Sequence, residues 1–176
     1  RRTVCPACGL RRSAWRFHIP PRRIVACTSC HHEYVCSLDW DQQPSYVFAP
    51  DEADSINTDI DISYLLSVFE RYCLFGCRLL DIGCGRGRIE TRLLGLGWQP
   101  EQLHVIDASP DSVRHVREQL GLRNAQCRDA EAGLDSSWSC DCVLMIELLE
   151  HLWSPHKAIE NAVKCVKPGS ILIVRG

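Results

Sequence analysis

The sequence predicts an α/β fold in which a doubly wound parallel sheet follows a small cysteine-rich module. From residue 79 onward, short apolar runs alternate with segments whose apolar residues recur at helical spacing, and this is the pattern of strands joined by helical crossovers. The first run, Leu79–Ile82, enters a turn with three glycines in five residues. Such a turn binds ligands at the carboxyl edge of a parallel sheet, where the strand order reverses. Ahead of this region, two Cys-x2-Cys pairs predict the module.

The composition is that of a soluble globular protein. The 176 residues are 45% hydrophobic and 24% charged, with a formal net charge of -2, and this length suits one ordinary domain plus a small module. No apolar run approaches the roughly 18 residues that a membrane span needs. No hydrophobic signal segment follows the N-terminal arginines. We therefore expect a cytoplasmic protein with reduced thiols and no membrane partner.

The N-terminal module covers residues 1–36 and has the cysteine spacing of a zinc ribbon. Eighteen residues separate the two pairs, and each tight turn offers two thiolates. The predicted zinc ligands are Cys5, Cys8, Cys27 and Cys30. Residues 14–17 and 23–26 are β-prone and could pair between the turns. The module is too small to bury a core, so zinc would supply its folding energy, and four thiolates leave no open coordination position for chemistry.

Charge is distributed unevenly in the N-terminal region. Residues 1–32 contain seven arginines and no acid, whereas residues 24–70 contain nine acids and no lysine or arginine. A basic module can bind nucleic acid or a phosphorylated substrate. The same arginines can instead form a solvated surface that pairs with the acidic segment. The sequence leaves both interpretations open.

An acidic linker at residues 37–58 is predicted to separate the module from the main domain, residues 59–176. From about Asp59, apolar positions recur at helical spacing, so a helix leads into the first strand. The cysteines outside the two pairs scatter through apolar segments, and we expect them to be small core residues rather than nucleophiles. They are Cys36, Cys73, Cys77, Cys84, Cys127, Cys140, Cys142 and Cys165.

Helices and strands alternate after the glycine turn. The pattern predicts helices at about 87–95, 110–119 and 155–165, and strands at 103–107, 124–127, 141–146 and 171–175. A turn at 166–169 precedes the last strand. This alternation implies a parallel sheet with right-handed crossovers.

The glycine turn and a second carboxylate define a candidate ligand site. Gly83, Gly85 and Gly87 permit positive φ and let a ligand lie on backbone N–H groups, at the positive end of the next helix. Twenty residues past Gly87, an apolar run ends in Asp107, the position at which a βαβ nucleotide site holds ribose hydroxyls. Two carboxylates and a glycine loop therefore converge.

The residues around the turn also restrict the class of ligand. Arg88 stands where a dinucleotide site needs a further glycine, which disfavours NAD. No Gly-Lys-Ser or Gly-Lys-Thr follows the turn, so the phosphate-binding loop of nucleotide hydrolases is absent from the sequence. Asp81 would repel a pyrophosphate. The ligand should carry little negative charge.

Together these residues resemble the class I S-adenosylmethionine-dependent methyltransferases, from about residue 78 to the end of the chain. The family's first motif, acidic-x-Gly-x-Gly-x-Gly, is matched in full by Asp81, Gly83, Gly85 and Gly87. Asp107 matches the acidic end of the family's second strand, and Asp129 is similar to the acidic residue after its third. Residues 141–151 resemble the fourth strand with its loop, and residues 166–174 resemble the turn into the fifth. The resemblance implies a Rossmann-like methyltransferase fold with S-adenosylmethionine as cofactor.

The resemblance also implies roles for single residues. Asp107 would accept the ribose hydroxyls, Asp129 would lie beside the adenine amino group, and the methionyl end would be held by the first motif. The cofactor-binding positions so implied are Asp81, Gly83, Cys84, Gly85, Gly87, Asp107, Ala108, Asp129, Ala130 and Ile146.

Three polar residues after the fourth predicted strand are candidates for catalysis. His151 is the best available general base if the acceptor is a hydroxyl or amine, since its unperturbed pKa lies near neutrality, and Glu147 lies in the same loop. The spacing of Glu147, Glu150 and His151 also resembles the metal-binding motif of small-RNA 2′-O-methyltransferases, which requires a further downstream histidine. Structural capping of a helix is the third interpretation.

A zinc ribbon ahead of such a domain resembles two groups of methyltransferases. One acts on sugars or secondary metabolites and the other on ribosomal RNA guanine. We favour a small-molecule acceptor, with RNA, at a base or a 2′-oxygen, as the alternative. A protein that binds the cofactor without catalysis is a third possibility. Because the family's fold normally continues past a fifth strand, we expect the domain to be incomplete at its C-terminus.

Overall fold

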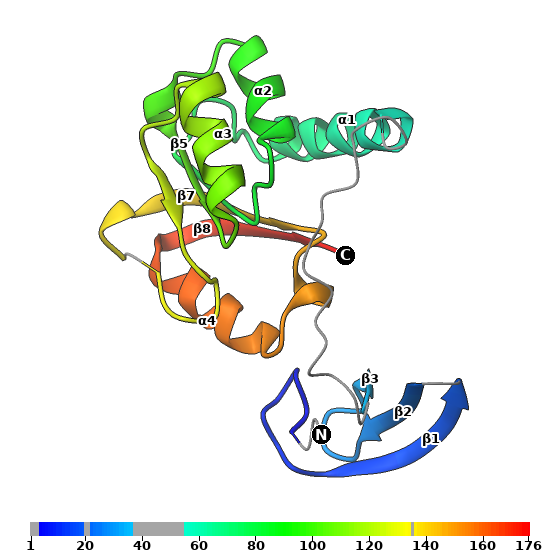
Figure 1. Cartoon of the computed structure of the whole chain (residues 1–176). Coiled ribbons are helices and arrows are strands. Elements are labelled where there is room, and N and C mark those ends of the chain that lie inside the picture. The colour runs from blue at the N-terminus through cyan, green and yellow to red at the C-terminus, as the bar shows by residue number, and fades with distance from the viewer. Residues whose placement is uncertain (1–3, 20–21, 37–54, 135) are drawn as a thin grey trace. The chain divides into compact units, whose positions relative to one another are not determined.

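A computed structural model describes residues 4–19, 22–36, 55–134 and 136–176 (Figure 1). Most of the predicted linker at 37–58 lies outside these residues. The chain divides into two compact units, an N-terminal one built of strands and a larger α/β one, and each is described by itself.

The N-terminal unit contains a three-stranded antiparallel sheet in the order β1-β2-β3. Its strands are β1 (Ser13–Ile19), β2 (Arg22–Cys27) and β3 (Glu33–Val35). The predicted pairing is confirmed, with Ala14 opposite Ala26. The only buried apolar cluster within the described part of this unit is Cys5, Cys27 and Tyr34, with Val25 packed against it. So small a cluster supports the expectation that the sheet depends on its cysteine turns.

The second unit is built on a five-stranded sheet in which every pairing is parallel. The strands are β4 (Leu79–Ile82), β5 (Leu103–Asp107), β6 (Ala125–Cys127), β7 (Cys140–Ile146) and β8 (Val166–Arg175). The helices are α1 (Ser55–Arg71), α2 (Arg88–Gly95), α3 (Pro110–Leu120) and α4 (Pro155–Lys164). Short 3-10 turns lie at Pro100–Gln102, Ser136–Trp138 and Leu149–His151. The predicted α/β class is confirmed.

The strand order is β6-β5-β4-β7-β8, so the direction of winding reverses beside β4. From β4 the chain moves outward to β5 and β6, and then returns to place β7 on the other side of β4. The connections that leave the carboxyl ends of β4 and β7 run to opposite faces of the sheet. In folds of this kind, this arrangement makes a crevice at that edge of the sheet, and ligands bind in it.

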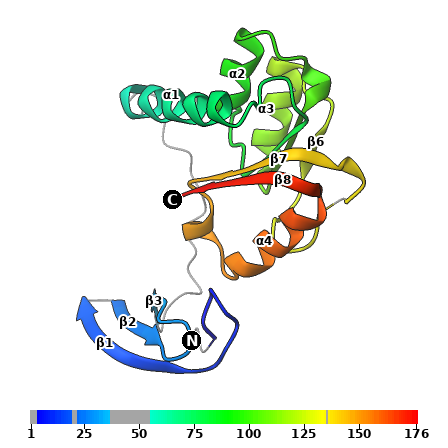
Figure 2. The same cartoon turned by 180° about the vertical axis from the view of Figure 1, so that it is seen from behind.

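Helices cover both faces of the sheet. Helices α1, α2 and α3 lie over one face and α4 lies over the other, as the two opposite views show (Figure 1 and Figure 2). On the first face Phe69 and Leu93 belong to one buried cluster with strand residues, and on the second face Ala158 packs with Ile106 and Met145. Fully burying a large apolar side chain contributes roughly 1.5–3 kcal/mol, so these two clusters, rather than surface ion pairs, hold the sheet together.

Two predicted boundaries differ from the structure. The leading helix begins at Ser55 instead of about residue 59. The last strand begins at Val166, and the turn predicted at 166–169 is a bulge within it: Val166 pairs with Cys140, and Ile171 pairs with Cys142. Gly169 has a φ of 86°, which lets the extra residues leave the ladder without ending it.

The prediction that the eight remaining cysteines are core residues is partly wrong. Four of them are buried, Cys84, Cys140, Cys142 and Cys165, whereas Cys73 and Cys127 are exposed. Cys73 has a φ of 54° in the turn after α1, and Cys127 ends the short edge strand β6. An apolar sequence environment therefore did not guarantee burial at the ends of elements.

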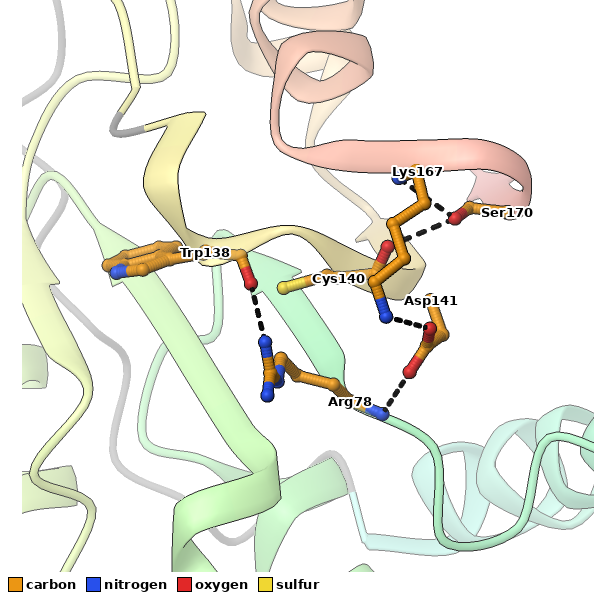
Figure 3. Close-up of polar contacts among 6 residues, drawn as sticks. All are labelled: Arg78, Trp138, Cys140, Asp141, Lys167 and Ser170. Carbon is orange, nitrogen blue, oxygen red and sulfur yellow. Dashed lines mark hydrogen bonds and ion pairs between the residues drawn. The ribbon is translucent and has the colours of Figure 1, made fainter.

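A polar clasp joins the amino ends of β4, β7 and β8 (Figure 3). The two carboxylate oxygens of Asp141 accept hydrogen bonds from the Arg78 backbone N–H at 2.9 Å and from Lys167 Nζ at 2.7 Å. The Arg78 side chain donates to the Trp138 carbonyl oxygen at 3.0 Å, and the Ser170 hydroxyl donates to a β7 carbonyl at 3.0 Å. This clasp lies at the edge opposite the crevice, so its role is structural.

Candidate functional site

The glycine loop connects the carboxyl end of β4 to α2. Gly83, Gly85 and Gly87 have φ angles of 87°, 54° and 74°, as the sequence predicts. The Gly83 N–H donates to the Ile106 carbonyl oxygen at 2.7 Å and the Gly87 N–H donates to the Cys84 carbonyl at 2.9 Å. The loop is therefore a fixed turn attached to β5.

The three glycines have different surroundings. A Cβ on Gly87 would lie 2.5 Å from Leu120 Cδ1 and 2.9 Å from Val116 Cγ1, and one on Gly83 would lie 3.0 Å from Leu148 Cδ1. A Cβ on Gly85 would meet nothing within 4 Å. Gly87 therefore lets the loop pack on α3, whereas Gly85 faces open space that a ligand can occupy.

Asp107, at the end of β5, is held by two backbone amides. Its Oδ2 accepts from the Gly85 N–H at 2.9 Å and its Oδ1 accepts from the Ser109 N–H at 2.8 Å. Ser109 caps α3 by accepting from the Ser112 N–H at 3.3 Å. Each carboxylate oxygen can accept further bonds, so Asp107 presents two fixed acceptor atoms beside the glycine loop.

Two carboxyl groups are buried beneath this loop. Asp81 on β4 is 3% exposed and Glu90 on α2 is 0% exposed. Burial raises the pKa of Asp81 well above its usual value, and the nearby carboxyls of Glu90 and Asp107 raise it further. Burial likewise raises the pKa of Glu90. The site is therefore short of positive charge, which suits a ligand that brings a cation.

Sequence reasoning missed Glu90. Its only signal was its position in the first turn of α2, one turn ahead of the buried Leu93, which places a carboxylate on the inward face of an amphipathic helix. In the described part of the chain, neither carboxyl oxygen of Glu90 has a hydrogen-bond donor. A buried acid without a donor is rare in folded proteins, so Glu90 is a candidate for a functional role.

Cys84 lies within the loop and is buried. Burial raises the pKa of its thiol, and the adjacent Asp81 carboxylate raises it further. A thiol that resists ionisation is a poor nucleophile. This environment agrees with the expectation that Cys84 fills space rather than performs chemistry.

The other predicted cofactor residues also lie at the carboxyl edge. Asp129 follows β6, and its Oδ1 accepts from the Glu131 N–H at 2.8 Å while its side chain stays exposed. Ala130 is buried, and its carbonyl accepts from Asn161 Nδ2 at 2.9 Å. Ala108 follows β5, and Ile146 ends β7. The loops that carry these residues all leave the sheet at its carboxyl edge.

Glu147 follows β7 in a strained conformation. Its φ is 50°, a region that costs a residue with a side chain on the order of 1–3 kcal/mol. Two contacts with β8 hold it: its N–H donates to the Arg175 carbonyl at 2.8 Å, and its carboxylate lies 3.7 Å from Arg175 Nε. Glu150 and His151 belong to the exposed 3-10 turn that follows. Among the described residues these three side chains do not gather as metal ligands.

The four cysteines predicted as zinc ligands do gather. Their sulfur atoms all lie within 4.8 Å of one another, with Cys5 Sγ 3.6 Å from Cys30 Sγ and Cys8 Sγ 3.6 Å from Cys27 Sγ. Tetrahedral zinc with Zn–S bonds of about 2.3 Å holds its sulfurs about 3.8 Å apart. Backbone N–H groups of Cys30 and Ser29 lower the pKa of Cys27 to about 6, whereas the pKa values of Cys8 and Cys30 are raised, because burial and neighbouring thiols oppose their ionisation. The cluster is compatible with a zinc site.

Comparison with known sequences identifies related proteins. A family model for the methyltransferase domain matches residues 80–174. A ubiquinone biosynthesis O-methyltransferase of Coxiella burnetii is 31% identical over 104 residues, covering 58% of this chain and 44% of that protein. One from Xanthomonas oryzae pv. oryzae is 27% identical over 143 residues, covering 77% and 53%. The chain spans about half the length of the curated relatives that it matches.

A solved structure shares the fold. The N-methyltransferase NodS from Bradyrhizobium japonicum, in complex with S-adenosyl-L-homocysteine, matches with a TM-score of 0.58 and 21% identity, covering 69% of this chain and 63% of that one. Within the described residues, no helix has both the length and the apolar character to cross a membrane.

Proposed function

The chain belongs to the methyltransferase-domain family, and from this premise we propose that it binds S-adenosylmethionine at the glycine loop and transfers the methyl group to a small molecule. The observation that carries the proposal is the position of Asp107, fixed by the Gly85 N–H beside open space. A carboxylate so held is ready to accept both hydroxyls of a ribose. NodS, whose fold is similar, is known in complex with S-adenosyl-L-homocysteine.

Each part of the cofactor has a candidate partner in the crevice. Asp107 would accept the ribose hydroxyls, and Asp129 would lie beside the adenine amino group. Asp81 and the N–H groups of the glycine loop would hold the methionyl end, with Gly85 leaving room for it. Cys84, Ala108, Ala130 and Ile146 would supply apolar contacts around these polar ones. The acids match a cofactor with an ammonium group and a sulfonium.

When bound, the cofactor supplies a methyl group on a positively charged sulfur. The acceptor's nucleophile attacks the methyl carbon in line with the carbon–sulfur bond, and the sulfur leaves as a neutral thioether. The residues of the chain then have to orient the acceptor and exclude water. We propose that His151 takes the proton that a hydroxyl or amine loses, and that Glu147, kept in its strained conformation by Arg175, orients this loop. Because Glu147, Glu150 and His151 do not gather around one point, the general base is preferred over a metal.

A small-molecule acceptor is favoured by the names of the relatives, which are O-methyltransferases of ubiquinone biosynthesis. RNA is the competing acceptor, supported by exposed arginines on the first unit, such as Arg11, Arg12 and Arg23. Cofactor binding without catalysis is the third possibility. We further propose that the ribbon binds one structural zinc and that the protein works in the cytoplasm, where thiolates stay reduced.

Calorimetric titration with S-adenosylhomocysteine tests the proposal. Asp107→Ala should weaken binding at least about tenfold, because a charge-assisted bond contributes about 1.5–3 kcal/mol and about 1.4 kcal/mol is a factor of ten. Asp111→Ala is the matched control, since this exposed acid on α3 contacts Arg114 at 2.6 Å instead. Loss of affinity in both variants, or no binding by the unaltered protein, would refute the site.

Transfer of labelled methyl groups then separates the acceptors. The protein is incubated with methyl-labelled cofactor and either a panel of hydroxyl-bearing small molecules or total RNA. Label in the small molecules supports the proposal. Label in RNA would instead support an RNA methyltransferase. If the cofactor binds but neither the small molecules nor the RNA are labelled, the protein binds the cofactor without catalysis.

A further inference from the structure

Glu90 is a buried acid that the proposed cofactor contacts do not use. It lies in the first turn of α2 and is 0% exposed, and no described donor reaches either of its carboxyl oxygens. A Cβ built on Gly87 would lie 3.5 Å from Glu90 Oε2. The carboxyl group is therefore directly beneath the glycine loop, inside the protein and next to the ligand site.

The charged groups that shift the pKa of Asp81, the neighbour of Glu90, are themselves acidic. Asp81 comes from β4, and burial together with the nearby Glu90 carboxyl raises its pKa. Asp107 comes from β5 and adds to the negative charge around Asp81. Cys84, from the loop, remains a neutral thiol because burial and the carboxyls of Asp81, Glu90 and Asp107 oppose its ionisation. Each charged neighbour that acts on Asp81 is thus another carboxyl group.

Two buried carboxyl groups in contact cannot both ionise without a cation. Like charges at close range in a low-dielectric interior repel strongly, and one proton held between the two groups removes that repulsion. The proton also supplies the donor that Glu90 otherwise lacks. The pair then titrates as one unit, so the proton belongs to both groups together.

We propose that Asp81 and Glu90 hold one shared proton before the cofactor binds, and that the cofactor's ammonium group replaces it. Binding would then release the proton to solvent. This inference rests on the proposed function, because it takes the ammonium of S-adenosylmethionine as the incoming cation. Glu90 acts through Asp81 and is a positioning residue: it keeps the Asp81 carboxyl neutral until a cation arrives.

Proton release makes affinity depend on pH. An ammonium favours the ionised form of Asp81, so the bound pair loses its proton at a lower pH than the unbound pair. Between these two values, affinity should rise with pH by up to about tenfold per unit, the limit for release of one proton. Below that range the proton competes with the cofactor.

Calorimetry in two buffers with different ionisation enthalpies measures the proton directly. S-adenosylhomocysteine is titrated into the unaltered protein and into Glu90→Gln at the same pH values. The glutamine amide donates to Asp81 and carries no charge, so Asp81 should already be ionised. We expect the unaltered protein to release up to one proton more than Glu90→Gln, and the affinity of the variant to vary less with pH. Glu118→Gln, an exposed acid on α3, should behave as the unaltered protein does.

The unfolding of the protein without ligand is an independent readout. Because the pair has a raised pKa in the folded state, its contribution to stability is present at low pH and is lost as pH rises through the folded value. Glu90→Gln should reduce this loss, because its amide donates to the ionised Asp81, whereas Glu90→Leu, which leaves Asp81 buried without a donor, should keep it. A merely structural role for Glu90 would lower stability at every pH.

The outcomes separate the two proposals. If the ligand binds with equal proton release in the unaltered protein and Glu90→Gln, the coupling is refuted while the cofactor site stands. If S-adenosylhomocysteine does not bind at all, the proposed function fails and the coupling fails with it.

Discussion

Gly85 and Gly87 have similar backbone angles but opposite surroundings. Gly87→Ala adds a methyl group 2.5 Å from Leu120 Cδ1 at a φ of 74°. Overpacking costs about 1–3 kcal/mol and a left-handed alanine about 1–2 kcal/mol. We expect the free energy of unfolding to fall by about 2–5 kcal/mol, measured by urea denaturation.

Gly85→Ala should affect ligand binding more than stability. Its methyl group meets nothing within 4 Å, so the cost in stability is only the backbone strain of about 1–2 kcal/mol. The methyl group would instead occupy the space proposed for the cofactor, and affinity for S-adenosylhomocysteine should fall at least about tenfold. Unchanged affinity in Gly85→Ala would show that the ligand does not approach this side of the loop.

At the scale of single residues, the sequence indicated the carboxylates and glycines of the candidate site but not the buried Glu90 beneath them. Asp81, Asp107 and the three glycines are recognisable because a short motif fixes their spacing. Glu90 is not, since a glutamate in the first turn of a helix usually faces solvent and favours the helix N-terminus there. Only tertiary packing decides that this turn faces β4.

Among the elements, the clasp at the amino ends of β4, β7 and β8 gives a pH-dependent prediction. The hydrogen bond from Lys167 lowers the pKa of Asp141, and the Arg78 backbone N–H contributes to the shift. Because the pKa of Asp141 is lower in the folded state, its ionised form stabilises the protein at pH values above the unfolded-state pKa of about 4. This stabilisation is lost as pH falls through the folded-state pKa. Asp141→Asn should therefore lower stability at neutral pH and have little effect near pH 2.

The expected size of this effect is small. The two side chains are 46% and 41% exposed, so solvent screens the pair and the difference should stay below about 1 kcal/mol. Urea denaturation at both pH values measures it. Lys167→Met should reproduce the loss at neutral pH. A deficit of equal size at both pH values would contradict the electrostatic explanation.

The last strand shows why element boundaries were harder to predict than elements. Pro168 and Gly169 indicate a turn, and a turn was predicted. The structure keeps these residues within β8 because Val166 pairs with β7 before them and Ile171 pairs with it after them. Pairing between strands far apart in the sequence outweighs a local turn preference.

For the whole molecule, the division into two units predicts separable unfolding. If the ribbon folds around one zinc, a strong chelator should unfold it and leave the α/β unit, which has its own buried core. We expect two transitions in thermal unfolding, and chelation should remove one of them. S-adenosylhomocysteine should still raise the midpoint temperature of the other, which belongs to the α/β unit.

Metal analysis checks the same idea. Cys27→Ser should lower the zinc content from one ion per chain towards none, because Cys27 Sγ lies 3.6 Å from Cys8 Sγ within the cluster. Cys36→Ser is the control, since Cys36 is outside the four-sulfur cluster. Full retention of zinc in Cys27→Ser would show that the metal is held elsewhere.

The overall architecture was the part best predicted from the sequence. Alternating strands and helices sufficed for the parallel sheet, because crossover handedness and strand burial permit few other arrangements. The acceptor was not predictable to the same degree, since the spacing of Glu147 and His151 fits more than one chemistry. Specificity resides in loops, which follow fewer general rules than strands.

The attachment of Asp107 to both Gly85 and Ser109 has a kinetic consequence. One carboxylate links the loop after β4 to the start of α3, so neither segment has much freedom left to lose when a molecule docks there. Capture should then need no slow rearrangement, and mixing experiments should give a single exponential phase whose rate rises linearly with concentration. Differences in affinity among variants of this crevice would accordingly appear as differences in how long the complex lasts.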